Sequence, residues 1–215
     1  MKIIRISLLV VLAALVASCY PEEYDEDFDF GGRNYYLLPD TLPVLSDGES
    51  YEKSEEEIEL DAAILEEIAH QMDSAGYTRL TEADTTDEQK MNSAVVLLVN
   101  RSTDRYTEYY YDYYNYGYNY YGNYYGLNYY YPGYNYNYYY PWGYPVAYSY
   151  AVGTVIIELI DPLDPFEVGL EDNEVSYTVR WMAIMNGLAE MSSANTEQRI
   201  TDGIRQAFRQ SPYLY

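Results

Sequence analysis

A tyrosine-rich tract at residues 106–150 interrupts the chain and constrains its fold more than any other feature. Most of the 32 tyrosines lie in it, among asparagines and glycines, and the unit Asn119–Gly122 is repeated at once as Asn123–Gly126. Asn and Gly favour turns and weaken strands. The core must therefore come from segments on both sides of the tract, and we expect one domain over residues 34–213 with the tract as a low-complexity insertion.

Two amphipathic helices are predicted, one before the tract and one after it. The first has two alternative starts: a capping box of Ser54 with Glu57, or Asp61 as the cap. Its apolar stripe at helical spacing consists of Ile58, Leu65, Ile68, Ala69 and Met72. We expect Asn195 with Gln198 to cap the second helix. Its apolar face consists of Ile200, Ile204, Ala207 and Phe208. Each helix therefore has one face to bury.

Strands are predicted at residues 34–39, 77–80, 94–99, 154–160 and 175–183. The apolar run at 94–99 is typical of a buried central strand. Residues 175–183 alternate, which indicates an antiparallel strand buried on one face, and an Asp161-Pro162 turn is expected to end the strand before it. These elements predict a two-layer α+β fold with a mostly antiparallel sheet and two helices. The hairpin of the last two strands is expected at its centre, beside 94–99.

The N-terminus has the parts of a secretory signal. A positive start with Lys2 and Arg5 precedes an apolar run, Ile6–Val16, which is shorter than the ~20 residues of a membrane span. Small residues then lead to Cys19, the only cysteine in the chain. This ending resembles a bacterial lipobox, which implies that residues 1–18 are removed and that a diacylglyceryl group is attached to Cys19. The alternative is an ordinary secretory signal with a chance cysteine at its edge.

An acidic stretch follows, and residues 19–33 are predicted to be a solvated tether. An alternative interpretation of this stretch is a sorting signal for the outer face of the outer membrane. A calcium-binding loop is disfavoured, because the stretch lacks the residue order that such a loop requires. Removal of Lys2 and Arg5 takes the formal net charge from -23 to -25. Such a chain repels phosphate, so we expect no nucleic-acid partner and membrane attachment through acyl chains alone.

Catalytic and metal-binding patterns are missing from the sequence. The single histidine, His70, lies on the solvated side of the first helix, and lipidation of Cys19 leaves no thiol nucleophile. Glu158 is an acid within an apolar strand, for which an edge position or a ladder partner is the simpler explanation. We therefore predict no catalytic residue, no metal and no cofactor. A carboxylate-based envelope hydrolase remains the lesser alternative.

The tyrosine-rich tract has both structural and binding interpretations. It is either a disordered loop or a segment folded partly back over the sheet, or it binds ligands by stacking. The candidate ligand-binding residues are Tyr120, Tyr121, Tyr124, Tyr125 and Trp142. Glycans, cell-wall polymers, envelope proteins and other copies of the tract are the candidate partners. Residues 106–150 contain no Lys or Arg, which excludes single-stranded nucleic acid.

The order of these elements resembles that of a bacterial lipoprotein family, domain of unknown function 4136. The shared features are the lipobox, the strand ending near Pro39, the helix closing on Gly76-Tyr77, the strand Ala94–Asn100, the strand from Gly153-Thr154 to Asp161, the strand with Trp181, and the helix with Ile200 and Phe208 before Ser211-Pro212. The resemblance covers about residues 28–105 and 148–213. It departs at Ala183, where the family pattern has glycine.

The family implies a fold and a location but no reaction. We expect a lipid-anchored protein of the bacterial outer membrane, on its periplasmic or surface face, with a non-catalytic structural or interaction role. The first alternative is a module that binds glycans or cell-wall polymer through the tract.

Overall fold

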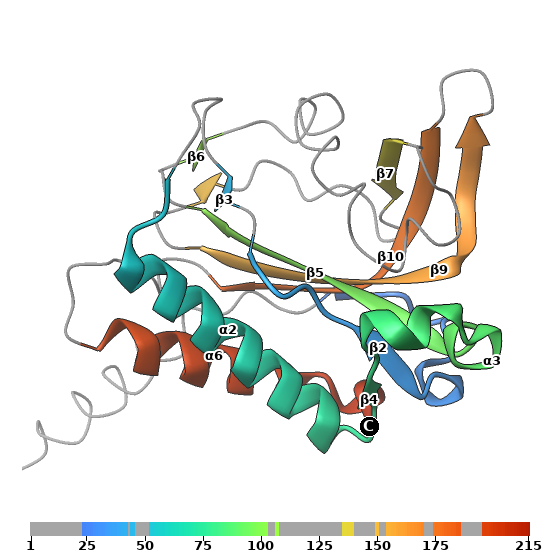
Figure 1. The fold of residues 1–215 in the computed structure, drawn as a ribbon, viewed down its shortest axis with the longest axis horizontal. Helices are drawn as coiled ribbons and strands as arrows, with labels where there is room; N and C mark the ends of the chain where they lie inside the picture. The colour runs from blue at the N-terminus through green and yellow to red at the C-terminus, as the bar shows by residue number, and fades with distance from the viewer. Residues whose placement is uncertain are drawn as a thin grey trace, which may run out of the picture.

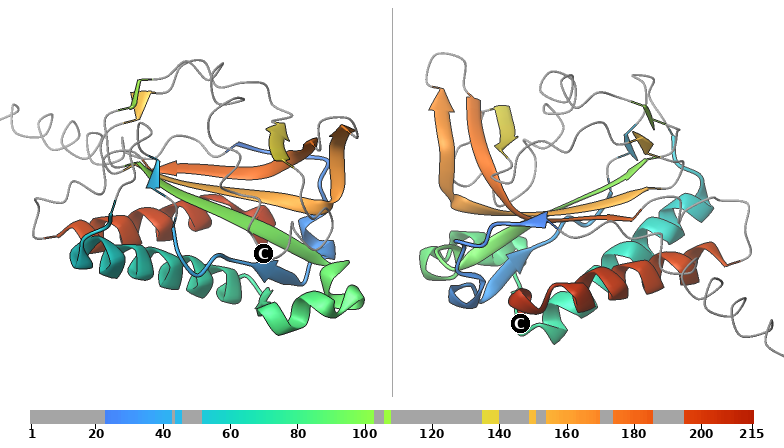
Figure 2. Two further views of the ribbon diagram at one scale, coloured as in Figure 1. Left: turned by 45° about the horizontal axis from the view of Figure 1, so that its top comes forward. Right: turned by 180° about the vertical axis from the view of Figure 1, so that it is seen from behind.

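The computed structural model describes residues 23–42, 44–45, 52–102, 106–107, 135–139, 149–150, 154–169, 174–185 and 195–215. A twisted sheet forms one layer, and the two long helices, α2 (Glu55–Ser74) and α6 (Thr196–Gln210), lie side by side on one of its faces (Figures 1 and 2). The α+β prediction with two main helices is thus confirmed. None of the helices in these ranges combines the length and the apolar content that crossing a membrane requires.

The main sheet is mixed, and its long central strands are antiparallel. Its strands are β1 (Glu23–Tyr24), β10 (Glu174–Met185), β9 (Val155–Gly169), β5 (Ala94–Ser102), β2 (Tyr35–Leu37) and β4 (Thr78–Arg79), in that order. In addition, β3 (Val44–Leu45) pairs with β5, and β7 (Asn135–Tyr139) pairs with β10. The predicted hairpin is central: β9 lies between β10 and β5 and is antiparallel to both.

Helix α2 begins at the earlier of the two predicted starts. Ser54 Oγ accepts a hydrogen bond from the Glu57 amide at 3.3 Å, while the Ser54 amide donates to the Glu57 carboxylate at 3.0 Å. The predicted stripe is wrong at Ile58, whose exposed fraction is 56%. The buried apolar residues of α2 are Leu60, Ile64, Leu65, Ile68 and Met72. The helix ends before Gly76, whose φ of 96° suits glycine.

Strand β9 does not end at Asp161-Pro162. It continues to Gly169 because its pairing with β10 resumes after register shifts near Tyr177 and Val179. The prediction that the 175–183 strand is buried on one face is also wrong for its described side chains. Trp181 and Ala183 face the helices, and Met182 and Ile184, which alternate with them, are buried as well.

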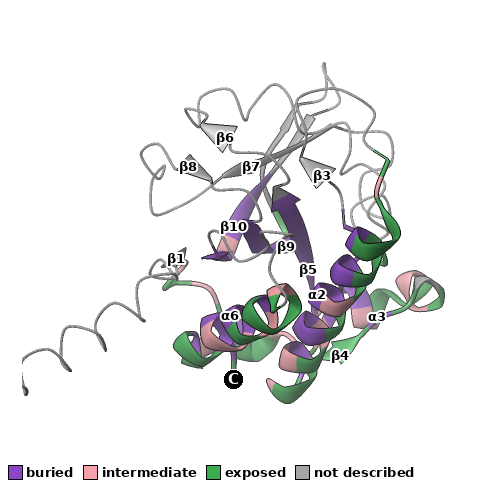
Figure 3. Cartoon of the chain, turned by 90° about the vertical axis from the view of Figure 1, so that its left-hand side faces the viewer, coloured by how far each residue is buried: buried purple, intermediate pink, exposed green. Residues whose placement is uncertain are grey.

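The core between the sheet and the helices is built around Trp181. Its ring lies 5.3 Å from that of Phe208 on α6, and its indole N–H donates to Ser211 Oγ at 2.9 Å. The predicted apolar face of α6 is buried as expected, as Figure 3 shows for both helices. Asn195 precedes the helix, but its side chain makes no capping hydrogen bond, so the predicted cap is wrong.

Residues 23–33, here called the N-terminal strap, lie against the domain. The strap contains β1 and a short 3-10 helix, η1 (Phe30–Gly32). Glu23 and Tyr24 pair with Met182 and Trp181 of β10, and Tyr24 stacks on Tyr213 at 3.8 Å between ring centroids. Phe30 is buried in the core. The prediction of a solvated tether is therefore wrong for residues 23–33, because aromatic side chains among the acids anchor them. Residues 19–22 lie outside the described residues.

Candidate functional site

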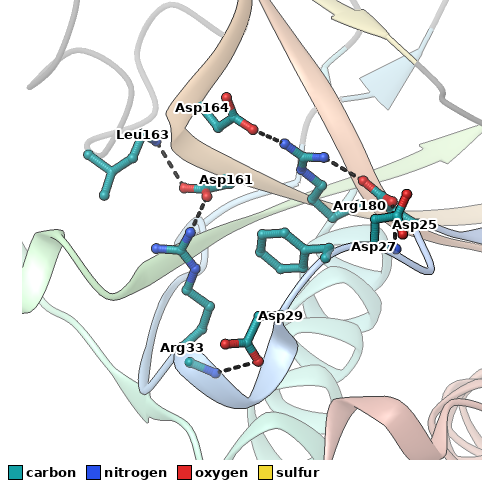
Figure 4. Close-up of a pocket in the computed structure, with 10 residues that line it drawn as sticks. Asp25, Asp27, Asp29, Arg33, Asp161, Leu163, Asp164 and Arg180 are labelled. Carbon is teal, nitrogen blue, oxygen red and sulfur yellow. Dashed lines mark hydrogen bonds and ion pairs between the residues drawn. The ribbon is translucent and has the colours of Figure 1, made fainter.

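A cavity of about 550 Å³ opens between the strap and the strands β9 and β10 (Figure 4). The strap places Phe28 and Arg33 in its wall, and β10 contributes Arg180. Five aspartates complete the charged lining: Asp25, Asp27 and Asp29 from the strap, and Asp161 and Asp164 from β9. With two arginines against five carboxylates, the lining carries a formal charge of -3.

Phe28 connects the two arginines. The guanidinium carbon of Arg33 lies 5.4 Å from the centroid of the Phe28 ring, and that of Arg180 lies 5.1 Å from it. Both distances fall within the range of a cation–π contact. The apolar side chain of the strap is thus held by two cations, one from the strap itself and one from the sheet.

Ion pairs join the strap to both strands. Arg33 forms an ion pair with Asp161 and donates to the Asn92 carbonyl at 3.1 Å. Arg180 forms ion pairs with Asp25 of the strap and with Asp164, while its backbone carbonyl accepts from the Asp25 amide at 2.8 Å. These contacts clamp the strap against β9 and β10.

Asp161 is the most enclosed acid of the pocket. Burial raises the pKa of its carboxyl, while the hydrogen bond from the Leu163 amide, at 3.0 Å, and the charge of Arg33 lower it by less. One oxygen accepts from Leu163 and the other from Arg33. Because both oxygens are occupied, Asp161 is arranged as a clamp rather than as a general base.

The open side of the pocket is acidic. Asp27 and Asp164 are exposed there, so their carboxylates can accept hydrogen bonds from a ligand or pair with its positive group. Within the described residues there is no group of three or more acidic, His or Cys side chains able to hold a metal ion. The geometry suits binding of a polar or cationic group.

A second cluster of charges is sealed from water. Arg101, at the end of β5, is 1% exposed and donates from Nε to Asp61 at 2.7 Å and from Nη2 to Glu57 at 3.3 Å. Lys53 forms a further ion pair with Asp61. This cluster joins the first turns of α2 to the sheet, and within it Lys53, at 20% exposed, lies nearest to water.

Most of the sequence-predicted site residues cannot be placed. Cys19, Tyr120, Tyr121, Tyr124, Tyr125 and Trp142 lie outside the described residues. His70 is exposed on α2, as expected. Glu158 is buried in the central strand β9, so the proposed edge position is wrong.

Sequence reasoning missed the pocket because the acids of the strap indicated a solvated segment. The available signal was the spacing of Tyr24, Phe28 and Phe30 among those acids. A segment that only spaces a domain from an anchor needs no such aromatic side chains.

The fold and the pocket define an α+β domain in which an N-terminal strap forms one wall of a charged pocket. The chain matches the family model described as domain of unknown function (DUF4136) over residues 22–213, and it belongs to that family. The match begins one residue before β1, which agrees with the strap being part of the domain.

A solved structure supports this assignment. A DUF4136 family protein from Bacteroides thetaiotaomicron VPI-5482 is 25% identical, with 91% of this chain and 96% of that chain covered and a TM-score of 0.58. The PelC dodecamer from Paraburkholderia phytofirmans is 11% identical over 88% of this chain and 93% of that chain, but its TM-score of 0.38 carries no argument. A search of the curated proteins finds no match.

Proposed function

We propose that the protein is a lipoprotein of the bacterial cell envelope, anchored in the outer membrane through acyl chains on Cys19. The observation that carries the proposal is the single cysteine directly behind a charged start and a short apolar run. Two or more acyl chains anchor a protein stably, since each buried methylene contributes about 0.8 kcal/mol.

The proposed role is structural or interactive rather than catalytic. Two features support it: the pocket side chains are engaged with one another, and the chain has a single histidine, which lies on an exposed helix face. The pocket between strap and sheet is the part of the described structure best suited to a partner, which we expect to be polar or cationic because the lining is acidic.

Cys19→Ala tests the anchor. Cells that express the natural chain are expected to incorporate a fatty-acid label into the protein and to hold it in the membrane fraction. The variant is expected to lose the label and to leave that fraction. Tyr20→Phe serves as the matched control, since it changes the residue after the cysteine and leaves both the small residues before it and the sulfur in place. A variant without the sulfur that stays firmly bound to membranes contradicts the proposal.

Binding of glycans or cell-wall polymer through the tyrosine-rich tract is the second candidate function. The composition of the tract favours it, because tyrosine offers a flat apolar face with a hydroxyl and few rotors to immobilise. One part of the tract, β7, is attached to the sheet through β10. Replacement of Tyr120, Tyr121, Tyr124 and Tyr125 by alanine is expected to abolish binding in a polymer pull-down. Unchanged binding by this variant eliminates the tract as the binding site.

A further inference from the structure

The sealed cluster around Arg101 has as many positive as negative charges. Arg101 reaches Glu57 and Asp61, and Lys53 adds a second cation at Asp61. Two positive groups thus face two carboxylates. Such a balance suits a site with little water, because a buried charge is costly unless it is paired.

Arg180 in the pocket lies between two carboxylates without a second cation. Its Nη1 forms an ion pair with Asp25 and its Nη2 forms one with Asp164, as Figure 4 shows. Among the described residues, neither carboxylate pairs with any other cation. This group therefore has one positive charge against two negative ones. One further positive charge gives it the balance of the sealed cluster.

Asp164 is the carboxylate at which a further cation can bind. It is 67% exposed, whereas Asp25 is 12% exposed. Asp27 lies on the same open side, is exposed, and makes no ion pair within the described part of the chain. A positive group at Asp164 leaves Arg180 paired with Asp25, so the strap keeps this tie to β10. Binding there is therefore compatible with the strap in place.

The lining of the pocket also has an apolar part. Phe28 and Leu163 border the cavity, and Leu163 is 38% exposed although it is apolar. A small hydrated cation gains nothing from such side chains. The methylenes of a lysine or arginine side chain leave water when they contact them, while the charged end stays with the carboxylates. The lining therefore favours a cation at the end of an alkyl chain.

Arg180 also has an unused hydrogen-bond donor. Its Nε is buried and has no acceptor within the described residues, although the side chain lies in the wall of the cavity. A buried donor without an acceptor is unfavourable, so an oxygen brought by a ligand has a donor to bind. A peptide supplies such an oxygen in its backbone carbonyl.

We propose that the pocket binds a lysine or arginine side chain of a partner protein, with the positive end at Asp164 and the methylenes on Leu163. A backbone carbonyl beside that side chain accepts from Arg180 Nε. The proposal rests on the interaction role proposed above and names the partner class of the same pocket, a basic peptide segment. The chain's net charge of -23 attracts such a partner from a distance.

Asp164→Asn tests the cation site and spares the fold, because Asp164 is exposed and Arg180 keeps Asp25. The matched control is Glu56→Gln, which removes an exposed acid of α2 and changes the net charge equally, outside the pocket. The probes are a blocked Gly-Lys-Gly peptide, the same peptide with glutamine for lysine, and glucosamine as a cationic sugar. Binding to the full chain is followed by NMR at low salt.

The lysine peptide is expected to bind the natural chain and Glu56→Gln alike. It is expected to bind Asp164→Asn about three- to fivefold more weakly, which is the strength of an exposed ion pair. Added salt is expected to weaken binding to the natural chain.

The contrary results separate the cation site from the proposed function. Equal weakening by Asp164→Asn and Glu56→Gln, or none by either, means attraction to net charge alone and overturns the site. Equal binding of both peptides that is lost in Asp164→Asn overturns the cation but keeps the pocket as a polar binding site. Tighter binding of glucosamine than of the lysine peptide overturns the peptide partner. Binding of no probe overturns both the inference and the assignment of a partner to this pocket.

Discussion

The sealed cluster around Arg101, at the end of β5, and the open clamp around Arg180, in the middle of β10, use the same kinds of residue. Each has an arginine that reaches two carboxylates, yet Asp61 in the first is 6% exposed and Asp164 in the second is 67% exposed. Where water is excluded, an unpaired charge is costly, so the pairs must stay intact. Where water enters, an ion pair contributes little to stability, so a ligand can replace one of its two partners. Access of water thus separates a structural cluster from a candidate binding site.

The largest expected effect in this comparison comes from Arg101→Leu. The change leaves Glu57 and Asp61 buried beside each other without their main cation, so we expect a loss of about 3–5 kcal/mol in the free energy of unfolding, measured by urea denaturation. The matched control is Arg205→Leu on the 42% exposed Arg205, which removes one partner of Glu67 on the same helix. Glu67 is 8% exposed and keeps the hydrogen bond from the Gln71 side-chain amide at 2.8 Å. We expect the control to cost about 1 kcal/mol or less.

Adding Asp61→Asn to Arg101→Leu sharpens this result. The double variant removes one of the stranded charges and is expected to recover part of the stability. A loss for Arg101→Leu no greater than that of the Arg205 control contradicts the description of the cluster as sealed.

The next largest effect concerns the hydroxyl of Tyr77, which binds the strap to the domain. Tyr77 donates to the Phe30 carbonyl at 3.3 Å, and burial raises the pKa of Tyr77 to about 12. In the unfolded chain this group ionises near pH 10. Its contribution to stability is therefore complete below about pH 10 and is lost as the pH rises to about 12, by about 2.7 kcal/mol for a difference of about two pKa units.

Tyr77→Phe is expected to make the fall in unfolding free energy between pH 10 and pH 12 shallower. The measurement is urea unfolding followed by circular dichroism at each pH. Some decline remains, because burial also raises the pKa of Tyr36. An identical pH dependence in the variant and the natural chain contradicts this assignment.

Regular patterns allowed much of the fold to be predicted, and competing interactions explain where prediction failed. The strand at 94–99 and the apolar face of α6 follow directly from periodicity, and both are confirmed. Ile58 has helical spacing but lies beyond the edge of the sheet-facing stripe. The continuation of β9 through Pro162 depends on pairing with β10, which no local signal reveals.

The candidate pocket was less predictable than the fold. It joins Arg33 to Asp161 across 128 positions of sequence, and such long-range ion pairs leave no periodic trace. The sealed cluster could not be predicted for the same reason. The sequence suggests Asp61 as a helix cap, but its partner is Arg101 on the sheet.

A smaller effect is expected for Arg180→Gln in the open clamp. The variant loses ion pairs to Asp25 and Asp164 and one cation over Phe28, but Asp164 is 67% exposed and Asp25 keeps partial access to water at 12%. We expect a loss of about 1–2 kcal/mol in unfolding free energy. Proteolysis within the strap is expected to accelerate, because the ion pair between Asp25 and Arg180 is gone and the backbone pairing of β1 with β10 remains. A loss equal to that of Arg101→Leu removes the contrast between the two clusters.

The smallest effect is expected for Asp161→Asn and concerns pH. Folding raises the pKa of Asp161, so its contribution to stability is present below the ordinary value of about 4 and is lost as the pH rises through the raised value. The asparagine side chain is uncharged at every pH. The variant is therefore expected to show a flatter dependence of stability on pH between pH 4 and pH 7, measured by thermal unfolding. A profile that keeps its slope assigns the titration to another group.

The anchor is tested most directly by the intact mass of the mature protein purified from its native membrane. The account predicts a chain that begins at Cys19 and is heavier than its amino acids by a diacylglyceryl group and any further acyl chain. A chain of unmodified mass with a free thiol, or one that begins at another residue, contradicts it.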